Sequence, residues 1–74
     1  MSERLPVISG KNFIRILENL GWTIRRQTGS HVILADSDGK RTIPVLQHKT
    51  LDKGLLHSLI KQAGLTQDEF RKLL

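Results

Sequence analysis

The sequence predicts an α+β fold, a two-layer sandwich in which helices cover one face of a three-stranded antiparallel sheet. Apolar residues recur at helical spacing in two stretches, near residues 9–21 and 52–64. Between them lie three short strand-like runs separated by glycine-containing turns. The expected order is helix, three strands, helix and a short C-terminal helix. We expect it to form a single domain across residues 1–74.

The first helix is expected after an extended lead-in over residues 1–8, where Pro6 favours extended backbone. Ser9 is a suitable N-cap, and Gly21 a suitable stop signal beyond the last turn. The expected buried stripe consists of Phe13, Ile16, Leu17 and Leu20. Asn12, Arg15, Glu18 and Asn19 are expected to face solvent.

The first strand is expected over 22–28, where Trp22 and Ile24 alternate with polar residues as in a half-buried strand. Gly29 and Ser30 then supply a tight turn. The next run, HVILA at 31–35, is apolar on both faces, which is typical of a central strand.

The sequence DSDG predicts a hairpin, because Asp38-Gly39 tolerates positive φ. The third strand, RTIPV at 41–45, should lie at an edge because Pro44 has no N–H to donate.

The second helix is expected from about Asp52 to Gly64. Its apolar positions are Leu55, Leu56, Leu59, Ile60 and Ala63. Thr66 and Glu69 have the spacing of a capping box for a final helix that should anchor Phe70 and Leu73 or Leu74. Double-stranded-RNA-binding domains have this element order, although a fold alone does not determine function.

The composition limits the function classes. Twelve Lys and Arg against seven Asp and Glu give a net charge of +5, which favours a polyanion or an acidic protein as partner, the alternative being solubility alone. The absence of cysteine excludes disulfides and thiolate metal sites. The first ten residues contain no long apolar run and no run reaches a membrane span, so we expect no signal peptide, no membrane segment and a cytoplasmic location.

His31 is the candidate for chemistry, at the start of the central strand. If Val32 and Leu34 point toward the helices, His31 and Ile33 lie on the opposite face; the reverse register places His31 at the edge of the core. Imidazole exchanges protons near neutral pH, so it can take the proton of a ribose 2′-hydroxyl while cations stabilise the phosphate. The alternative is a histidine that only spaces or caps the strand start.

The other two histidines are weaker candidates for chemistry. His48 is expected in a solvated loop, and His57 on the second helix at the border of the core. The histidine spacing fits no metal-binding pattern, so we expect no metal and no small-molecule cofactor.

Basic side chains form a second candidate. Lys49 and Lys53 lie where the second helix should begin, a position that favours anions, although ordinary solvated lysines are an equal alternative. Lys11 raises the same question at the first helix, and Lys40 and Arg41 extend a basic edge. Arg25 is expected on the strand beside His31.

Three segments in order resemble the HicA toxin family of type II toxin–antitoxin systems. They are SGKNFIRILENLGWTIRRQTGSHVIL, DGKRTIPV and LDKGLLHSLIKQAGLTQDEF, which together span Ser9 to Phe70. The features that carry the resemblance are a helix ending in LG, GSH at a strand start, a DG hairpin, a proline-containing strand and KGLL opening a helix.

The resemblance implies a small ribonuclease that cleaves messenger RNA, with a fold like that of a double-stranded-RNA-binding domain. It places the family's catalytic histidine at His31, after Gly29 and Ser30, and implies an antitoxin, HicB, that covers this histidine. The family's K-G step corresponds to Lys53-Gly54. Many relatives carry a histidine directly after the proline-containing strand, whereas His48 comes later here, so no role is transferred to it and the general acid stays unassigned.

The leading hypothesis is a metal-independent endoribonuclease toxin with His31 as the general base. The residues expected to contact RNA are Lys49, Lys53, Arg25, Ser30 and Gly29. One alternative is a non-catalytic RNA-binding module in which the cations hold phosphates and His31 is incidental. Another is a protein-interaction domain that holds an acidic partner on its basic face.

Overall fold

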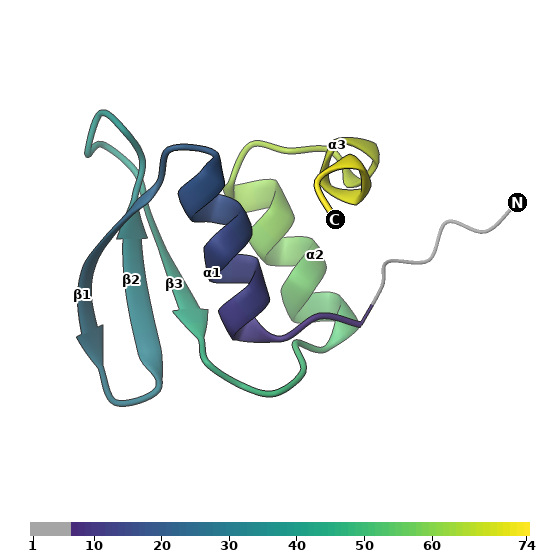
Figure 1. Ribbon diagram of the computed structural model, residues 1–74, viewed down its shortest axis with the longest axis horizontal. Coiled ribbons are helices and arrows are strands. Elements are labelled where there is room, and N and C mark those ends of the chain that lie inside the picture. The colour runs from purple at the N-terminus through teal and green to yellow at the C-terminus, as the bar shows by residue number, and fades with distance from the viewer. Residues whose placement is uncertain (1–6) are drawn as a thin grey trace, which may run out of the picture.

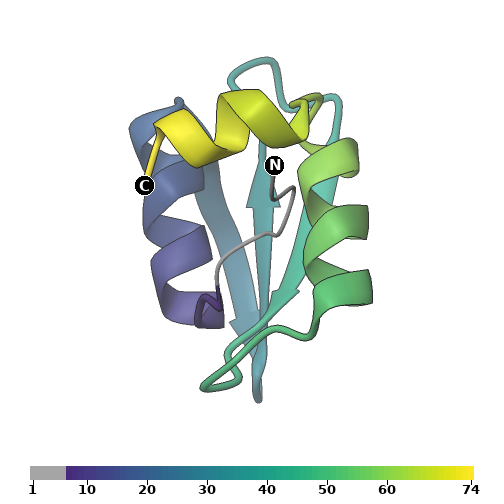
Figure 2. The ribbon, with the colours of Figure 1, turned by 90° about the vertical axis from the view of Figure 1, so that its right-hand side faces the viewer.

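The computed structural model describes residues 7–74, and its element order confirms the predicted α+β fold (Figure 1). The elements are α1 (Gly10–Asn19), β1 (Thr23–Thr28), β2 (His31–Ala35), β3 (Thr42–Leu46), α2 (Lys53–Gln62) and α3 (Gln67–Lys72). The antiparallel sheet has the order β1-β2-β3, so β2 is central as predicted. Both long helices cover one face of the sheet, and α3 lies across them on the far side (Figures 1 and 2).

The first helix begins and ends near the predicted residues. The hydroxyl of Ser9 accepts a hydrogen bond from the backbone N–H of Asn12 at 3.1 Å, and Gly21 follows the helix with a φ of 104°. The expected lead-in falls mostly on residues 1–6, outside the described residues, but Ile8 forms an antiparallel bridge with Leu51. This bridge ties the entry of α1 to the entry of α2.

One member of the predicted stripe of α1 was wrong. Phe13 and Leu17 are fully buried and Ile16 packs at the edge of the core, but Leu20 is 42% exposed. The helix ends at Asn19, so Leu20 is already the C-cap and no longer follows the helical face. Ile14 takes its place among the buried side chains.

The first strand is not half-buried, as the alternation predicted. All six residues of β1 are exposed, and Ile24 keeps 46% of its surface. Trp22, immediately before the strand, is the residue that enters the core. The difference arises because β1 is an edge strand and because a bulge between Ile24 and Arg26 interrupts the alternation.

The other two strands supply the sheet's share of the core. Val32 and Leu34 of β2 and Ile43 and Val45 of β3 are buried against the helices. Pro44 lies on the exposed side of β3, and β3 is an edge strand, as its missing N–H predicted.

The C-terminal elements close the core. Thr66 and Glu69 form the predicted capping box in both directions, at 3.1 and 2.9 Å. Phe70 is fully buried, and its ring centroid lies 5.6 Å from that of Phe13. Neither Leu73 nor Leu74 is anchored, because they follow the last turn and remain 41% and 58% exposed. Within residues 7–74, no helix is both long and apolar enough to cross a membrane.

Candidate active site at one end of the sheet

His31 lies exposed on the face of the sheet that the helices leave open. Val32 and Leu34 point into the core, so the first of the two registers predicted for this strand is the one observed. Thr28 of β1 and Leu46 of β3 lie opposite His31 and therefore share its face. The helices lie on the opposite face, and the exposed imidazole is open to a ligand from solvent.

The bulge in β1 brings two arginines to this open face. Thr23 and Thr28 both lie on it, opposite Ala35 and His31. Alternation from Thr23 places Arg25 on the open face, and alternation back from Thr28 places Arg26 there as well. The bulge reconciles the two counts, because it inserts one residue between Ile24 and Arg26. A regular strand would instead turn one guanidinium to the helix-facing side of the sheet.

The turn beside His31 is held by its backbone. Gly29 adopts a φ of 57°, a conformation that favours glycine. The carbonyl of Ser30 accepts a hydrogen bond from the N–H of Gln47 at 2.8 Å, which extends the pairing of β2 and β3 beyond Leu46. The Ser30 side chain is left exposed next to the imidazole-bearing strand end.

The loop between β3 and α2 is also fixed by its backbone, and it starts directly alongside His31. The N–H of Gly10 donates to the carbonyl of His48 at 3.0 Å, and the N–H of Leu51 donates to Ile8 at 2.8 Å. Gly10 packs so closely that a Cβ on it would overlap the carbonyl oxygen of Leu46. The chain therefore leaves β3, passes the start of α1 and enters α2 at the same end of the sheet as the Gly29-Ser30 turn (Figure 1).

This arrangement gathers most of the predicted site residues. His31, Gly29, Ser30, Lys49 and Lys53 lie at the end of the molecule where both long helices begin, and all are exposed. Among residues 7–74, the side chains of both lysines have no hydrogen-bond or ion-pair partner. Their ammonium groups remain available to an anion.

The structure differs from the predicted site in two respects. The guanidinium of Arg25 extends toward the other end of the sheet, where a Cβ on Gly39 would lie 3.6 Å from its Nη1 atom. The start of α2 is already capped by a carboxylate, since Asp52 accepts from the N–H of Leu55 at 2.8 Å. Any anion held there depends on the lysines more than on free N–H groups.

The other two histidines are not part of this cluster of site residues. His48 is exposed in the loop, as predicted. His57 is also exposed instead of bordering the core, and its Nε2 lies 3.2 Å from the amide nitrogen of Gln67, which links α2 to α3. No group of three or more potential metal ligands occurs among residues 7–74.

Comparison with known protein families gives a match over residues 10–65 to the family described as HicA toxin of bacterial toxin-antitoxin. The chain belongs to the HicA toxin family. Membership confirms the resemblance found in the sequence and establishes a toxin role with a cognate antitoxin as partner. None of the curated proteins compared matches this chain.

The HicA match runs from α1 through the end of α2. It includes His31 and the turns on either side of β2. Helix α3 lies outside it. Arg26 is the residue that sequence reasoning missed in this HicA chain. Strict alternation would place Arg25 and Arg26 on opposite faces, and only the bulge, which no residue of the sequence marks, puts both on the open face.

Proposed function

We propose that this toxin is a metal-independent endoribonuclease that cleaves messenger RNA, with His31 as the general base. The observation that carries the proposal is the exposed imidazole on the open sheet face, at the end where the side chains of Lys49 and Lys53 have no hydrogen-bond or ion-pair partner among residues 7–74. One domain then supplies both RNA binding and cleavage. The exposed backbone of Gly29 and Ser30 gives the RNA chain close access to the imidazole.

The chemistry needs only these groups and the RNA. A neutral imidazole nitrogen of His31 accepts the proton of a ribose 2′-hydroxyl, and the 2′-oxygen attacks the adjacent phosphorus. The bond from phosphorus to the 5′-oxygen breaks, and that oxygen takes a proton from solvent or from an unassigned acid. Lysine and arginine side chains stabilise the charge that builds on the phosphoryl oxygens. The products are a 2′,3′-cyclic phosphate and a 5′-hydroxyl.

The same site suggests how the antitoxin inhibits the toxin. We propose that it is a HicB-type protein and that it covers His31, because an imidazole on an open face is blocked only by something laid over that face. The proposed location of the pair is the cytoplasm, where messenger RNA is present.

Cleavage of total RNA in EDTA by wild type, His31→Ala and His31→Gln tests the assignment. We expect both variants to lose about 10²–10⁴-fold in rate, the usual contribution of a positioned base, and to keep their thermal stability because the ring is exposed. His57→Ala is the matched control, since this exposed histidine lies on α2. Equal cleavage by His31→Ala would refute the assignment, and loss of wild-type cleavage in EDTA would refute metal independence.

A second candidate function is RNA binding without cleavage. The observation that favours it is the bulge, which places Arg25 and Arg26 together on the open face. Binding should then weaken with salt, with log K falling by about 0.7 per phosphate contact for each tenfold rise in salt. Salt-dependent binding without any cleavage product would support this function, and a cyclic phosphate end would exclude it.

A further inference from the structure

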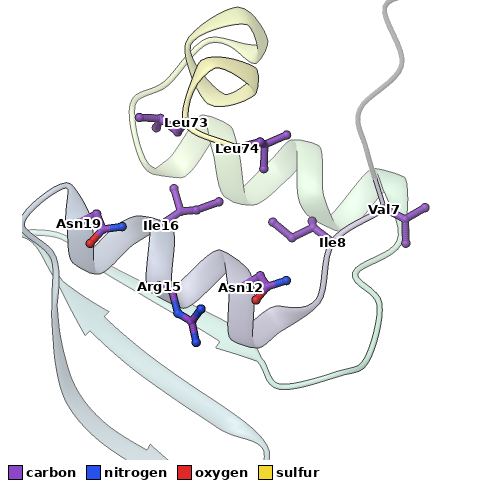
Figure 3. A pocket seen from close by; sticks show the side chains of 8 residues that line it. All are labelled: Val7, Ile8, Asn12, Arg15, Ile16, Asn19, Leu73 and Leu74. Carbon is purple, nitrogen blue, oxygen red and sulfur yellow. The ribbon is translucent and has the colours of Figure 1, made fainter.

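A groove lies on the outer side of the helical layer, between α1 and the C-terminal end of the chain (Figure 3). Its volume is about 380 Å³. The apolar walls are Val7, Ile8, Ile16, Leu73 and Leu74. Three of these expose large apolar surfaces: Val7 is 81%, Leu74 58% and Leu73 41% exposed. Three large apolar side chains exposed beside one groove make it a candidate docking surface.

The groove is separate from the candidate active site. His31 lies on the open face of the sheet, whereas the groove lies on the far side of α1 from the sheet (Figures 1 and 3). Four of its five apolar walls, Val7, Ile8, Leu73 and Leu74, also fall outside residues 10–65, the part that matches the HicA family. The groove is therefore built half by residues of α1 inside the matched segment and half by residues outside it.

The charge of the groove defines its occupant. Arg15 is the only ionisable residue among the eight that line it, and the other polar ones are two asparagines of α1. The Arg15 side chain is exposed and has no hydrogen-bond or ion-pair partner among the described residues. Arg15 lines the groove from α1, and its guanidinium points away from Leu73 and Leu74 (Figure 3). A segment long enough to seat apolar side chains in the groove and reach Arg15 is complementary to this surface if it also carries a carboxylate.

We infer that this groove is a second docking site for the cognate antitoxin, which seats apolar side chains against Leu73 and Leu74 and a carboxylate against Arg15. The inference rests on the toxin–antitoxin role. A contact here holds the toxin without occupying the open sheet face. Because half of the lining residues, Leu73 and Leu74 among them, lie outside the family match, the contact also helps this toxin to select its own antitoxin.

The test is titration of the purified toxin with the antitoxin encoded beside it, using calorimetry. We expect Leu74→Asp and Arg15→Glu each to raise Kd at least about tenfold, equivalent to about 1.4 kcal/mol, because one places a carboxylate against apolar groups and the other opposes the partner's carboxylate. Arg15→Lys should retain most of the affinity. Leu74 follows the last helix and is exposed, so its substitution leaves the fold intact, which circular dichroism verifies.

The matched controls lie on other elements. Ile24→Asp changes an apolar side chain of similar exposure, 46%, on β1, and Lys61→Glu reverses an exposed charge in the last turn of α2. Both should keep Kd within about twofold of wild type. Unchanged Kd in both groove variants would overturn the inference. Self-association that Leu74→Asp abolishes would also overturn it, by making a second copy of the chain the occupant.

Parallel RNA cleavage assays separate this inference from the proposed enzyme function. Free toxin with Leu74→Asp should cleave RNA at the wild-type rate, because the groove is remote from His31. If no form of the chain cleaves RNA but the groove variants lose antitoxin affinity, the ribonuclease proposal fails and the docking site stands. If wild type does not bind the antitoxin, the docking inference falls.

Discussion

The two ends of the sheet are held together in different ways. At the His31 end most of the fixing contacts are between backbones, with Gln47 to Ser30 at 2.8 Å and Gly10 to His48 at 3.0 Å. One side-chain pair joins them, in which the amide nitrogen of Gln27 donates to the amide oxygen of Gln47 at 3.1 Å. At the opposite end, where β2 turns into β3, the N–H of Asp36 donates to the Arg41 carbonyl at 3.1 Å, and side chains add to this backbone bond. The carboxylate of Asp36 accepts hydrogen bonds from the N–H of Lys40 at 3.0 Å and from the guanidinium of Arg41 at 3.4 Å.

Arg41 extends these contacts to the rest of the fold. Its Cζ lies 5.9 Å from the centroid of the Trp22 ring. Its Nη2 lies close to Gly64, at 3.6 Å from the position that a Cβ on this glycine would take. It thus connects the hairpin to the start of β1 and the end of α2. At this end Asp36, Arg41 and Trp22 are engaged with one another through their side chains.

The difference explains how a small domain can expose reactive groups without losing its shape. Where the backbone holds the frame, His31 and the lysines contribute little to stability and are free to bind a substrate. Where side chains hold the frame, they are not available for chemistry.

Gly10→Ala should be the most damaging change at the His31 end. An added Cβ would overlap the carbonyl oxygen of Leu46, and backbone atoms cannot move aside as a flexible side chain can. We expect a loss of about 1–3 kcal/mol or more in the free energy of unfolding. In a domain of this size each kcal/mol lowers Tm by about 4–8 °C, which calorimetry measures.

Gly54→Ala is the matched control, in the first turn of α2. A Cβ there would lie 3.7 Å from the Asp52 carboxylate, an ordinary contact. Alanine is the better helix former by about 1 kcal/mol, so this change should keep or raise Tm. Equal destabilisation by both substitutions would show that the close backbone approach at Gly10 does not hold this end together.

Arg41→Gln should weaken the opposite end by roughly 1 kcal/mol. The change removes a partly exposed cation–π contact and a surface ion pair, each worth about 0.5–1 kcal/mol. Urea unfolding measures the loss, while RNA cleavage per folded molecule should be unchanged because Arg41 lies away from His31. Lys40→Gln is the control, since the Lys40 side chain has no partner within residues 7–74. If cleavage falls with Arg41→Gln, the two ends are not independent.

The features that the sequence predicted correctly depend on local chemistry. The caps at Ser9 and Thr66, the turn at Gly39 and the edge position of Pro44 each follow from what one residue type can or cannot do within a few neighbours. The central position of β2 followed from its apolar run and from the meander order. These rules need no knowledge of distant contacts.

The features that it missed depend on what covers each element. Trp22 and Ile24 do alternate with polar residues in the sequence. The exposure of Ile24, however, depends on how far the helical layer extends over an edge strand. The run HVILA is apolar on both faces, so only the packed helices decide which way His31 points. The groove could not be foreseen, because residues 7 and 74 come together only in the folded chain.

The pH dependence of stability gives the smallest effect and isolates the hairpin end. Partial burial by itself would raise the pKa of Asp36, but hydrogen bonds from the Arg41 backbone and guanidinium and from the Lys40 N–H outweigh it, so the pKa is lowered. The folded state therefore binds this proton less readily than the unfolded chain. The stabilisation is fully present above about pH 4, the range of an unfolded aspartate, and is lost as pH falls through the folded-state pKa.

Asp36→Asn should accordingly flatten the acid limb of the stability profile and leave RNA cleavage per folded molecule near its wild-type value. Urea unfolding at a series of pH values from neutral down to about pH 2 measures the profile. Asp38→Asn is the control within the same hairpin, because the exposed Asp38 side chain accepts no hydrogen bond from residues 7–74. An acid limb of equal steepness in wild type and Asp36→Asn would mean that the carboxylate contacts do not hold this end. The contrast between a backbone-held end and a side-chain-held end would then lose its second half.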